Sequence, residues 1–140
     1  MHNVIDVTID FEFGLLNNKS MKVVVAYEKD IFEATPDNPS VKITQVNLPN
    51  SFEIQFSGKT NKDTIVDENG NILQDMYVKV VGLKFDHLIV PNWIVQKKLS
   101  YLTTSGQTLK TAYIGFNGLM KFDIPETNIF SLFRRLNKDE

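Results

Sequence analysis

Hydrophobic and polar residues alternate along most of this 140-residue chain. Between residues 5 and 13, apolar side chains occupy the odd positions and polar side chains occupy the even ones. This period of two predicts a half-buried β-strand. The segments MKVVVAYE, FEIQFS and MYVKVVGLKF repeat the pattern and are rich in β-branched or aromatic residues. Together with shorter apolar runs they predict about nine or ten strands, separated by regularly spaced turns.

Two breaks in the alternation predict β-bulges. Val41 and Ile43 share one parity while Val46 has the other, so an extra residue near Gln45 would restore the phase. Gly82 interrupts the last long strand and predicts a second bulge there. We therefore expect two strands that bend without ending.

Turn residues divide the rest of the chain. The sequence TSGQT predicts the turn of a hairpin, and Asn117-Gly118 between two apolar runs predicts another. Pro91 interrupts the apolar segment LIVPNWIV, which indicates an edge strand or two short pieces around a bend.

The end of the chain changes to a helical period. Its apolar residues recur at i, i+3, i+4 and i+7, as Ile129, Leu132, Phe133 and Leu136. We predict a short amphipathic helix over residues 127–137, capped by Thr127 or Asn128. The predicted fold class is therefore all-β: a single antiparallel β-sandwich domain over residues 1–140, jelly-roll-like, with this helix at its C-terminal end.

The composition excludes several classes of partner and site. The net charge is −2, whereas nucleic-acid-binding domains normally carry a basic excess, so nucleic acid is not a predicted partner. The absence of cysteine excludes disulfides and Cys-based zinc sites. No apolar run approaches the roughly 20 residues that span a bilayer, so no membrane insertion is predicted. The N-terminal MHNVIDVTIDFEF lacks the basic and apolar regions of a secretory signal peptide.

The segment DTIVDENGNILQD gathers acidic and amide side chains around Gly70. An EF-hand with this glycine at its sixth position would have Ile65 and Met76 as its end ligands, which excludes an EF-hand. Three interpretations stay open: a plain hairpin, a hairpin that holds a metal ion, and a catalytic cluster. The metal interpretation predicts a calcium site with four oxygen ligands: Asp63, Asp67, Asn69 and Asp75.

No set of residues in the sequence predicts an enzyme. A glycosidase needs two facing carboxylates, one of them with a pKa raised by burial, and carboxylates at a turn are too exposed for that role. His87 follows Asp86, but the chain has no Gly-x-Ser-x-Gly elbow and no glycine-rich phosphate loop. We therefore predict no catalytic residue and no cofactor besides calcium.

The aromatic residues Trp93, Tyr101 and Tyr113 carry a polar tip that suits a half-exposed position. Trp93 and Tyr101, with Asn92 as a polar neighbour, would form a sugar-binding face. The alternative is that Trp93 plugs one end of the sandwich, since large aromatic side chains are usually mostly buried.

The run FEIQFSGKTNKDTIVDENGNILQDMYVKVVGLKFDHLIV resembles the later half of jelly-roll carbohydrate-binding modules, including the calcium-dependent xylan-binding type. In those modules a strand like FEIQFS precedes an acidic loop, and a strand like VKVVGLKFDHLIV follows it. The resemblance implies a module that binds host-surface glycans, with or without calcium.

The whole chain is also similar in style to small open reading frames of tailed phages. The shared features are a bias to lysine, asparagine and isoleucine, the absence of cysteine, and an all-β body with an amphipathic end. This resemblance implies a non-enzymatic virion component, a capsid decoration or a tail or neck accessory, assembled in the host cytoplasm. Its partners would be other virion proteins or further copies of the chain. The expected docking residues are Phe130, Phe133, Arg134 and Arg135. The virion component is the first hypothesis, and the carbohydrate-binding module is the alternative.

Overall fold

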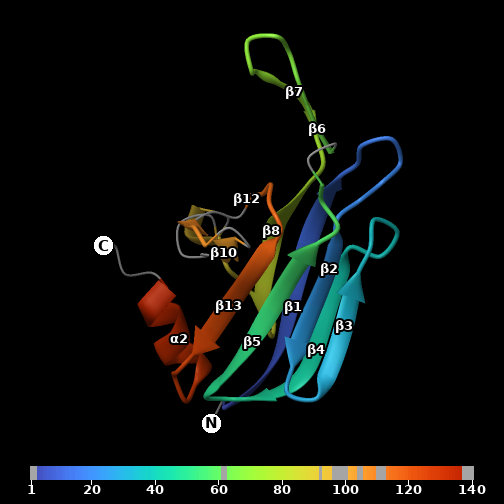
Figure 1. Ribbon diagram of the computed structural model, residues 1–140. Coiled ribbons are helices and arrows are strands. Elements are labelled where there is room, and N and C mark those ends of the chain that lie inside the picture. Colours follow the sequence, from blue (N-terminus) through green and yellow to red (C-terminus); the bar gives the residue numbers. More distant parts are fainter. Residues whose placement is uncertain are drawn as a thin grey trace.

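Two antiparallel β-sheets pack face to face, with a helix at the C-terminal end (Figure 1). The computed structural model describes residues 3–60, 63–91, 93–95, 101–103, 106–109 and 113–136. Within these residues the chain forms thirteen strands, more than predicted because several are only two or three residues long. The predicted fold class, an antiparallel β-sandwich with a short C-terminal helix, is confirmed.

The first sheet has the order β12 (Tyr113–Ile114), β8 (Tyr77–Phe85), β1 (Val4–Gly14), β4 (Ser40–Asn47), and β9 (Leu88–Ile89) also pairs with β8. The second sheet has the order β11 (Thr108–Leu109), β10 (Tyr101–Thr103), β13 (Gly118–Ile124), β5 (Asn50–Ser57), β2 (Lys22–Tyr27), β3 (Asp30–Ala34). A separate hairpin consists of β6 (Thr64–Val66) and β7 (Ile72–Asp75).

The core lies between the sheets and is built from the inward parity of each strand. In β1 the odd residues from Ile5 to Phe11 are at most 4% exposed, as the alternation predicts. Phe85 of the first sheet meets Phe122 of the second with ring centroids 6.1 Å apart, which joins the two inner faces. Each large aliphatic residue buried in this way stabilises the fold by about 1.5–3 kcal/mol.

Both predicted bulges are present. The pairing of β1 with β4 shifts between Ile5 and Val7, opposite Gln45, whose φ of 57° lies in the left-handed region. The pairing of β1 with β8 shifts where Asp10 pairs with Gly82. A Cβ at Gly82 would lie 2.7 Å from the Asp10 carboxylate, so the glycine gives that side chain room.

One predicted hairpin is confirmed and one is wrong. The TSGQT segment connects β10 to β11, which pair antiparallel. Asn117-Gly118 does not close a hairpin, because β12 pairs with β8 in the first sheet while β13 pairs with β5 in the second. The chain crosses here from one sheet to the other. Asn117 stabilises this crossing through two hydrogen bonds with the backbone of Lys59. Its side-chain oxygen accepts the N–H of Lys59 at 3.0 Å, and its side-chain N–H donates to the carbonyl of Lys59 at 2.9 Å.

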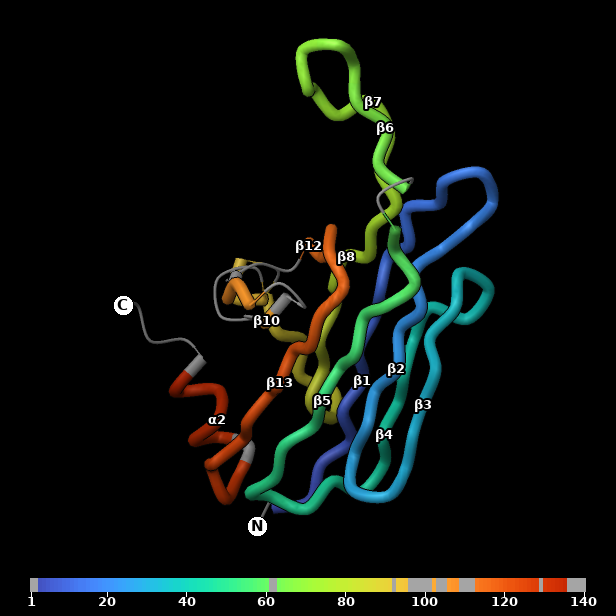
Figure 2. Tube along the Cα trace, viewed as in Figure 1, coloured from blue at the N-terminus to red at the C-terminus, as the bar shows by residue number. Residues whose placement is uncertain are grey.

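The β6–β7 hairpin, residues 64–75, projects from one end of the sandwich, and we call it the arm (Figures 1 and 2). Val66 pairs with Ile72. At the tip the N–H of Gly70 donates to the carbonyl of Asp67 at 3.0 Å, and Gly70 has a φ of 84° that favours glycine.

Two short helical elements follow the strands of the first half, one after Pro91 and one near the C-terminus. After β9, Pro91 begins a helical turn in which the N–H groups of Ile94 and Val95 donate to its carbonyl. The sequence predicted an edge strand or two short pieces around a bend, and the described residues form a short strand followed by this turn. The C-terminal helix α2 (Ile129–Leu136) is capped by Asn128, whose side chain accepts the N–H of Ser131 at 2.9 Å. No helix in the described part of the chain has the length and apolar character needed to cross a membrane.

Candidate functional site

Asp63 anchors one foot of the arm. Its side chain is almost fully buried and accepts two bonds from Thr60, from the N–H at 2.8 Å and from the hydroxyl at 3.0 Å. Lys19, on the loop between β1 and β2, donates to it at 3.1 Å. The backbone bond from Thr60, followed by the bonds from Lys19 and the Thr60 hydroxyl, holds the pKa of Asp63 below its ordinary value. The carboxylate is therefore a fixed, ionised anchor.

Asp75 anchors the other foot and receives three donors. Lys59 forms an ion pair with it, the hydroxyl of Thr64 donates at 2.7 Å, and the hydroxyl of Tyr113 donates at 3.1 Å. Burial by itself would raise the pKa of Asp75, but the bonds from Lys59, Thr64 and Tyr113 outweigh burial and lower it. Asp75 therefore stays ionised and is unsuited to general acid catalysis.

Asp67 closes the turn at the tip of the arm. One carboxylate oxygen accepts the N–H groups of Asn69 and Asn71, both at 2.9 Å, and the other accepts the Asn71 side-chain amide at 3.2 Å. The bond from the Asn71 N–H is the largest of the causes that lower the pKa of Asp67. This is the Asx-turn chemistry that makes aspartate common in turns.

The structure does not bring the predicted calcium ligands together. Thr64 pairs with Asp75, while Asp63 lies one residue earlier and the carbonyl of Asp63 accepts the N–H of Met76. Because successive strand residues face opposite ways, the two foot carboxylates turn to different partners, Lys19 and Lys59. Within the described ranges, no group of three or more histidine or acidic side chains is arranged to hold a metal ion.

Two stacked tyrosines lie beside the foot of the arm, and we call Tyr77 and Tyr113 the tyrosine shelf. Their ring centroids are 4.8 Å apart with an interplanar angle of 22°. The hydroxyl of Tyr77 donates to Glu12 at 3.0 Å, and this bond is the main cause that raises the pKa of Tyr77. Gly14 makes the position possible, because a Cβ there would overlap the Tyr77 ring. The Tyr113 side chain remains 42% exposed.

Lys59 connects the shelf to the crossing between the sheets. Its ammonium pairs with Asp75 and also donates to the carbonyl of Gly115 at 2.5 Å. The same ammonium lies 5.7 Å from the centre of the Phe116 ring, which is 60% exposed. The site thus combines exposed aromatic rings with ionised carboxylates that already have fixed positions. Such a surface can hold a ligand by ring contacts and by hydrogen bonds to its hydroxyl groups.

The residues predicted for glycan binding are only partly described. Trp93 is 55% exposed and is followed by the buried Ile94 and Val95, so it does not plug the sandwich. Tyr101 pairs through its backbone with Met120, and its side chain lies outside the described residues. Asn92 also lies outside them.

The four predicted docking residues divide into two pairs. Phe130 is 64% exposed, and Arg134 is also exposed. Phe133 instead packs edge-on against Phe85 with ring centroids 5.9 Å apart. Arg135 donates to Glu126 at 2.6 Å and to the carbonyl of Asp123 at 3.2 Å. The second pair therefore attaches α2 to the body.

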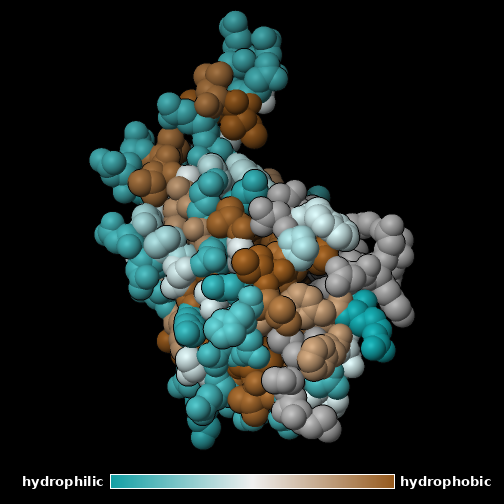
Figure 3. All heavy atoms as spheres, turned by 180° about the vertical axis from the view of Figure 1, so that it is seen from behind, coloured by the Kyte–Doolittle hydropathy of each residue, from teal (hydrophilic) through white to brown (hydrophobic). Residues whose placement is uncertain are grey.

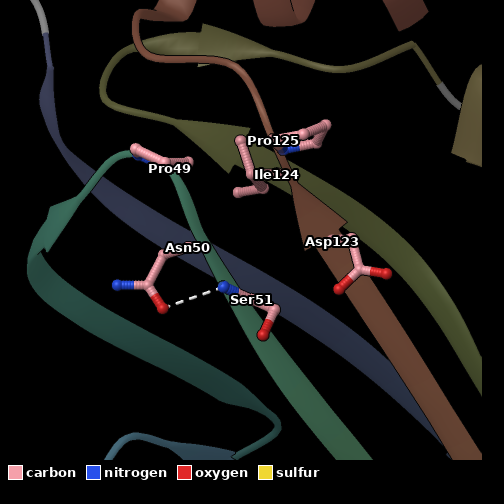
Figure 4. Close-up of a pocket in the computed structure, with 6 residues that line it drawn as sticks. All are labelled: Pro49, Asn50, Ser51, Asp123, Ile124 and Pro125. Atoms are coloured by element: carbon pink, nitrogen blue, oxygen red, sulfur yellow. Dashed lines mark hydrogen bonds between the residues drawn. The ribbon is translucent and has the colours of Figure 1, made fainter.

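A shallow depression lies at the end of the sandwich opposite the arm, where β5 begins and β13 ends (Figure 4). Six residues line it: Pro49, Asn50, Ser51, Asp123, Ile124 and Pro125. Asn50 accepts the N–H of Ser51 and donates to Tyr27, so its amide serves the turn between β4 and β5. The lining residues include no aromatic ring, and the tyrosine shelf is the better candidate for a ligand.

Comparison with solved structures gives two matches, and both are carbohydrate-binding modules. One is the selenomethionine form of vCBM60, from work on circular permutation between two families of calcium-dependent carbohydrate-binding modules. It has a TM-score of 0.51 and 10% identity, over 85% of this chain and 90% of that chain. The other is vCBM60 in complex with galactobiose, with a TM-score of 0.49 and 10% identity, over 84% of this chain and 97% of that chain.

The first of these likenesses supports the β-sandwich fold. No protein-family model matches the chain, and no curated protein matches it. Neither matched structure is a virion protein, so these comparisons give the phage hypothesis no support.

Sequence reasoning missed Tyr77, Lys59 and Glu12. Tyr77 occupies the outward parity of β8, between the buried Met76 and Val78. An aromatic residue at an outward position was the available signal, because outward positions of half-buried strands are normally polar. The contacts of Lys59 with Asp75 cross 16 residues and those of Tyr77 with Glu12 cross 65, which no local pattern reveals.

Proposed function

We propose that this protein is a non-catalytic carbohydrate-binding module and that the tyrosine shelf is its ligand platform. The observation that carries the proposal is the stacking of Tyr113 on Tyr77, with each hydroxyl fixed by a carboxylate. A sugar ring has apolar C–H faces and polar hydroxyl edges. An exposed ring bordered by carboxylate oxygens complements both parts.

The position of the shelf also supports this function. Tyr113 and Phe116 are both exposed and lie on either side of Gly115, whose carbonyl Lys59 holds in place. The platform is preorganised, because its side chains already satisfy one another and need little reordering when a ligand arrives. The likeness to vCBM60 supports the choice of carbohydrate as the ligand class by analogy of fold alone.

The described residues do not fit a preformed calcium site. Lys19 and Lys59 already neutralise Asp63 and Asp75, and Asp67 is occupied by N–H donors at the arm tip. A calcium ion would have to displace these protein donors before it could bind. Binding is therefore proposed to depend on the shelf, and calcium dependence is measured as a separate arm of the test.

The test is isothermal titration of the full chain with neutral oligosaccharides built from galactose, xylose or glucose, with calcium and again with a chelator. We expect at least one glycan to bind, and Tyr113→Ala to lower its affinity about tenfold or more. Phe130→Ala is the matched control, because it removes an exposed aromatic ring on α2, away from the shelf, and should leave affinity unchanged. Failure of every glycan to bind, or normal binding by Tyr113→Ala, would overturn the proposal.

A further inference from the structure

The arm exposes aliphatic side chains on both of its faces. Ile72 and Leu73 are 64% and 63% exposed, and Val66 is 50% exposed. Val66 and Ile72 pair on one face, and Ile65 pairs with Gln74 on the other. The arm carries hydrophobic side chains beneath a hydrophilic tip (Figure 3). Apolar side chains gathered on one projecting element mark an interaction surface.

The arm is held in position at its root. An isolated two-stranded hairpin is at best marginally stable in water. Here Lys19 and Lys59 bind its two feet through Asp63 and Asp75. The two ion pairs therefore fix the position of the arm and of its exposed aliphatic residues. Apolar side chains on both faces of a projecting hairpin favour a protein as its partner.

A groove on the outer face of the second sheet lies next to the root of the arm. It has a volume of about 530 Å³ and is lined by Gln55, Phe56, Ser57, Leu102, Gly106, Asn117, Gly118 and Leu119. Leu102 and Leu119 pair across β10 and β13 and are 49% and 38% exposed. The chain thus carries both an apolar projection and an apolar groove.

We propose that two copies of this chain form a symmetric dimer in which the arm of each copy enters the groove of the other. The arm reaches about 20 Å from its feet, at the rise of a β-strand. Because the groove lies at the arm's own root, two such arms run antiparallel beside each other, and each buries both faces. A two-fold contact of this kind is closed and self-complementary.

The size of the contact fits a stable dimer. The arm, residues 64–75, and the groove together provide about twenty residues from each copy. Stable interfaces of standard size use about 20–30 residues on each side.

The charges of the two surfaces also match. The tip of the arm carries the acidic residues Asp67 and Glu68. Lys22 is exposed on β2, and its Cα partner in β5 is the groove residue Ser57. The acidic tip of one copy and Lys22 of the other copy therefore attract each other when the arm docks.

The test is sedimentation velocity with light scattering over a concentration series of the full chain. We expect a concentration-dependent dimer, and the double variant Ile72→Lys, Leu73→Lys to raise its dissociation constant about 100-fold or more. The control is Ile31→Lys, which places a lysine at a side chain that is 73% exposed on the edge strand β3, away from the arm. This control should dimerise normally, and circular dichroism checks that every variant is folded.

A mixing experiment identifies the groove as the docking site. Leu73→Lys and Leu119→Asp should each weaken the dimer. When the two variants are mixed, one contact keeps the native arm and groove while the other pairs a lysine with an aspartate, so dimer mass should return. A wild-type chain that stays monomeric at about 0.5 mM overturns the proposal. Normal dimers of the arm variant, or mixed variants that stay monomeric, overturn it as well. Glycan binding by monomeric variants is independent of this outcome.

Discussion

Replacement of Lys59 by methionine would remove one charge from the root of the arm while keeping most of the side chain's apolar stem. The Lys59 and Asp75 side chains are only 9% and 12% exposed. In the variant, Asp75 would keep Thr64 and Tyr113 as donors but would lose its only described cationic partner. Lys59→Met also leaves the Gly115 carbonyl without its donor.

The magnitude follows from the burial of this pair. A hydrogen bond to a charged group contributes about 1.5–3 kcal/mol, and a buried acceptor left unsatisfied costs about 1–3 kcal/mol. We expect Lys59→Met to lower the free energy of unfolding by about 2–3 kcal/mol. For a chain of this length, the midpoint of thermal unfolding should fall by about 5–10 °C.

The assay is urea unfolding at pH 7 followed by tyrosine and tryptophan fluorescence, with Lys121→Met as the control. The Lys121 ammonium is 3.9 Å from Asp123, and the two side chains are 59% and 66% exposed. An exposed pair of this kind contributes about 0–1 kcal/mol, so the control should change stability by less than about 0.5 kcal/mol.

Equal effects of the two lysine variants would refute the reasoning, because the Lys59 pair is buried and closely bonded whereas the Lys121 pair is exposed. A second check is the double variant Lys59→Met, Asp75→Asn. Its cost should be smaller than the sum of the two single costs, since both substitutions break the same contact. Strict additivity would mean that Lys59 and Asp75 do not stabilise each other.

Two further predictions concern the shelf and the pH dependence. Gly14→Ala places a methyl group within the Tyr77 ring, so we expect glycan affinity to fall about tenfold in titration while the fold survives; unchanged affinity would contradict the role of the stacked rings. The folded state lowers the pKa values of Asp63, Asp67 and Asp75 below the unfolded value of about 3.9. The stability that these three carboxylates contribute is complete above that value and is lost as the pH falls through their folded pKa values. In urea unfolding, their contribution to the free energy of unfolding should therefore stay constant between pH 7 and 5 and decrease below about pH 4.

Much of the fold could be predicted because alternation directly reports which strand face is buried. The bulge at Gln45 was predictable for the same reason, since an extra residue shifts the parity of the apolar positions. The bulge at Gly82 was predictable because a glycine inside a strand often marks one. The prediction of a hairpin at Asn117-Gly118 was wrong, because a dipeptide that favours a tight turn carries no information about which sheet the next strand joins.

The site was harder to predict than the strands. The acidic segment attracted attention because its oxygens are close in sequence, but pairing in the arm turns Asp63 and Asp75 toward different lysines. The tyrosine shelf forms between residues that only the sheet pairing brings together. Tyr113 reaches Asp75 across 38 residues, and its half-exposed position is the part that its amphipathic ring did predict.

The crossing at residues 115–117 places the proposed ligand over a seam between the two sheets. Tyr113 belongs to the first sheet, while Lys59 follows β5 of the second sheet. The Lys59 ammonium donates to the Gly115 carbonyl, and its backbone N–H donates to the Asn117 side chain. A bound glycan would therefore contact residues attached to both sheets and oppose movement of one sheet relative to the other. Its presence should slow amide hydrogen exchange in strands of both sheets, including strands that the glycan never touches.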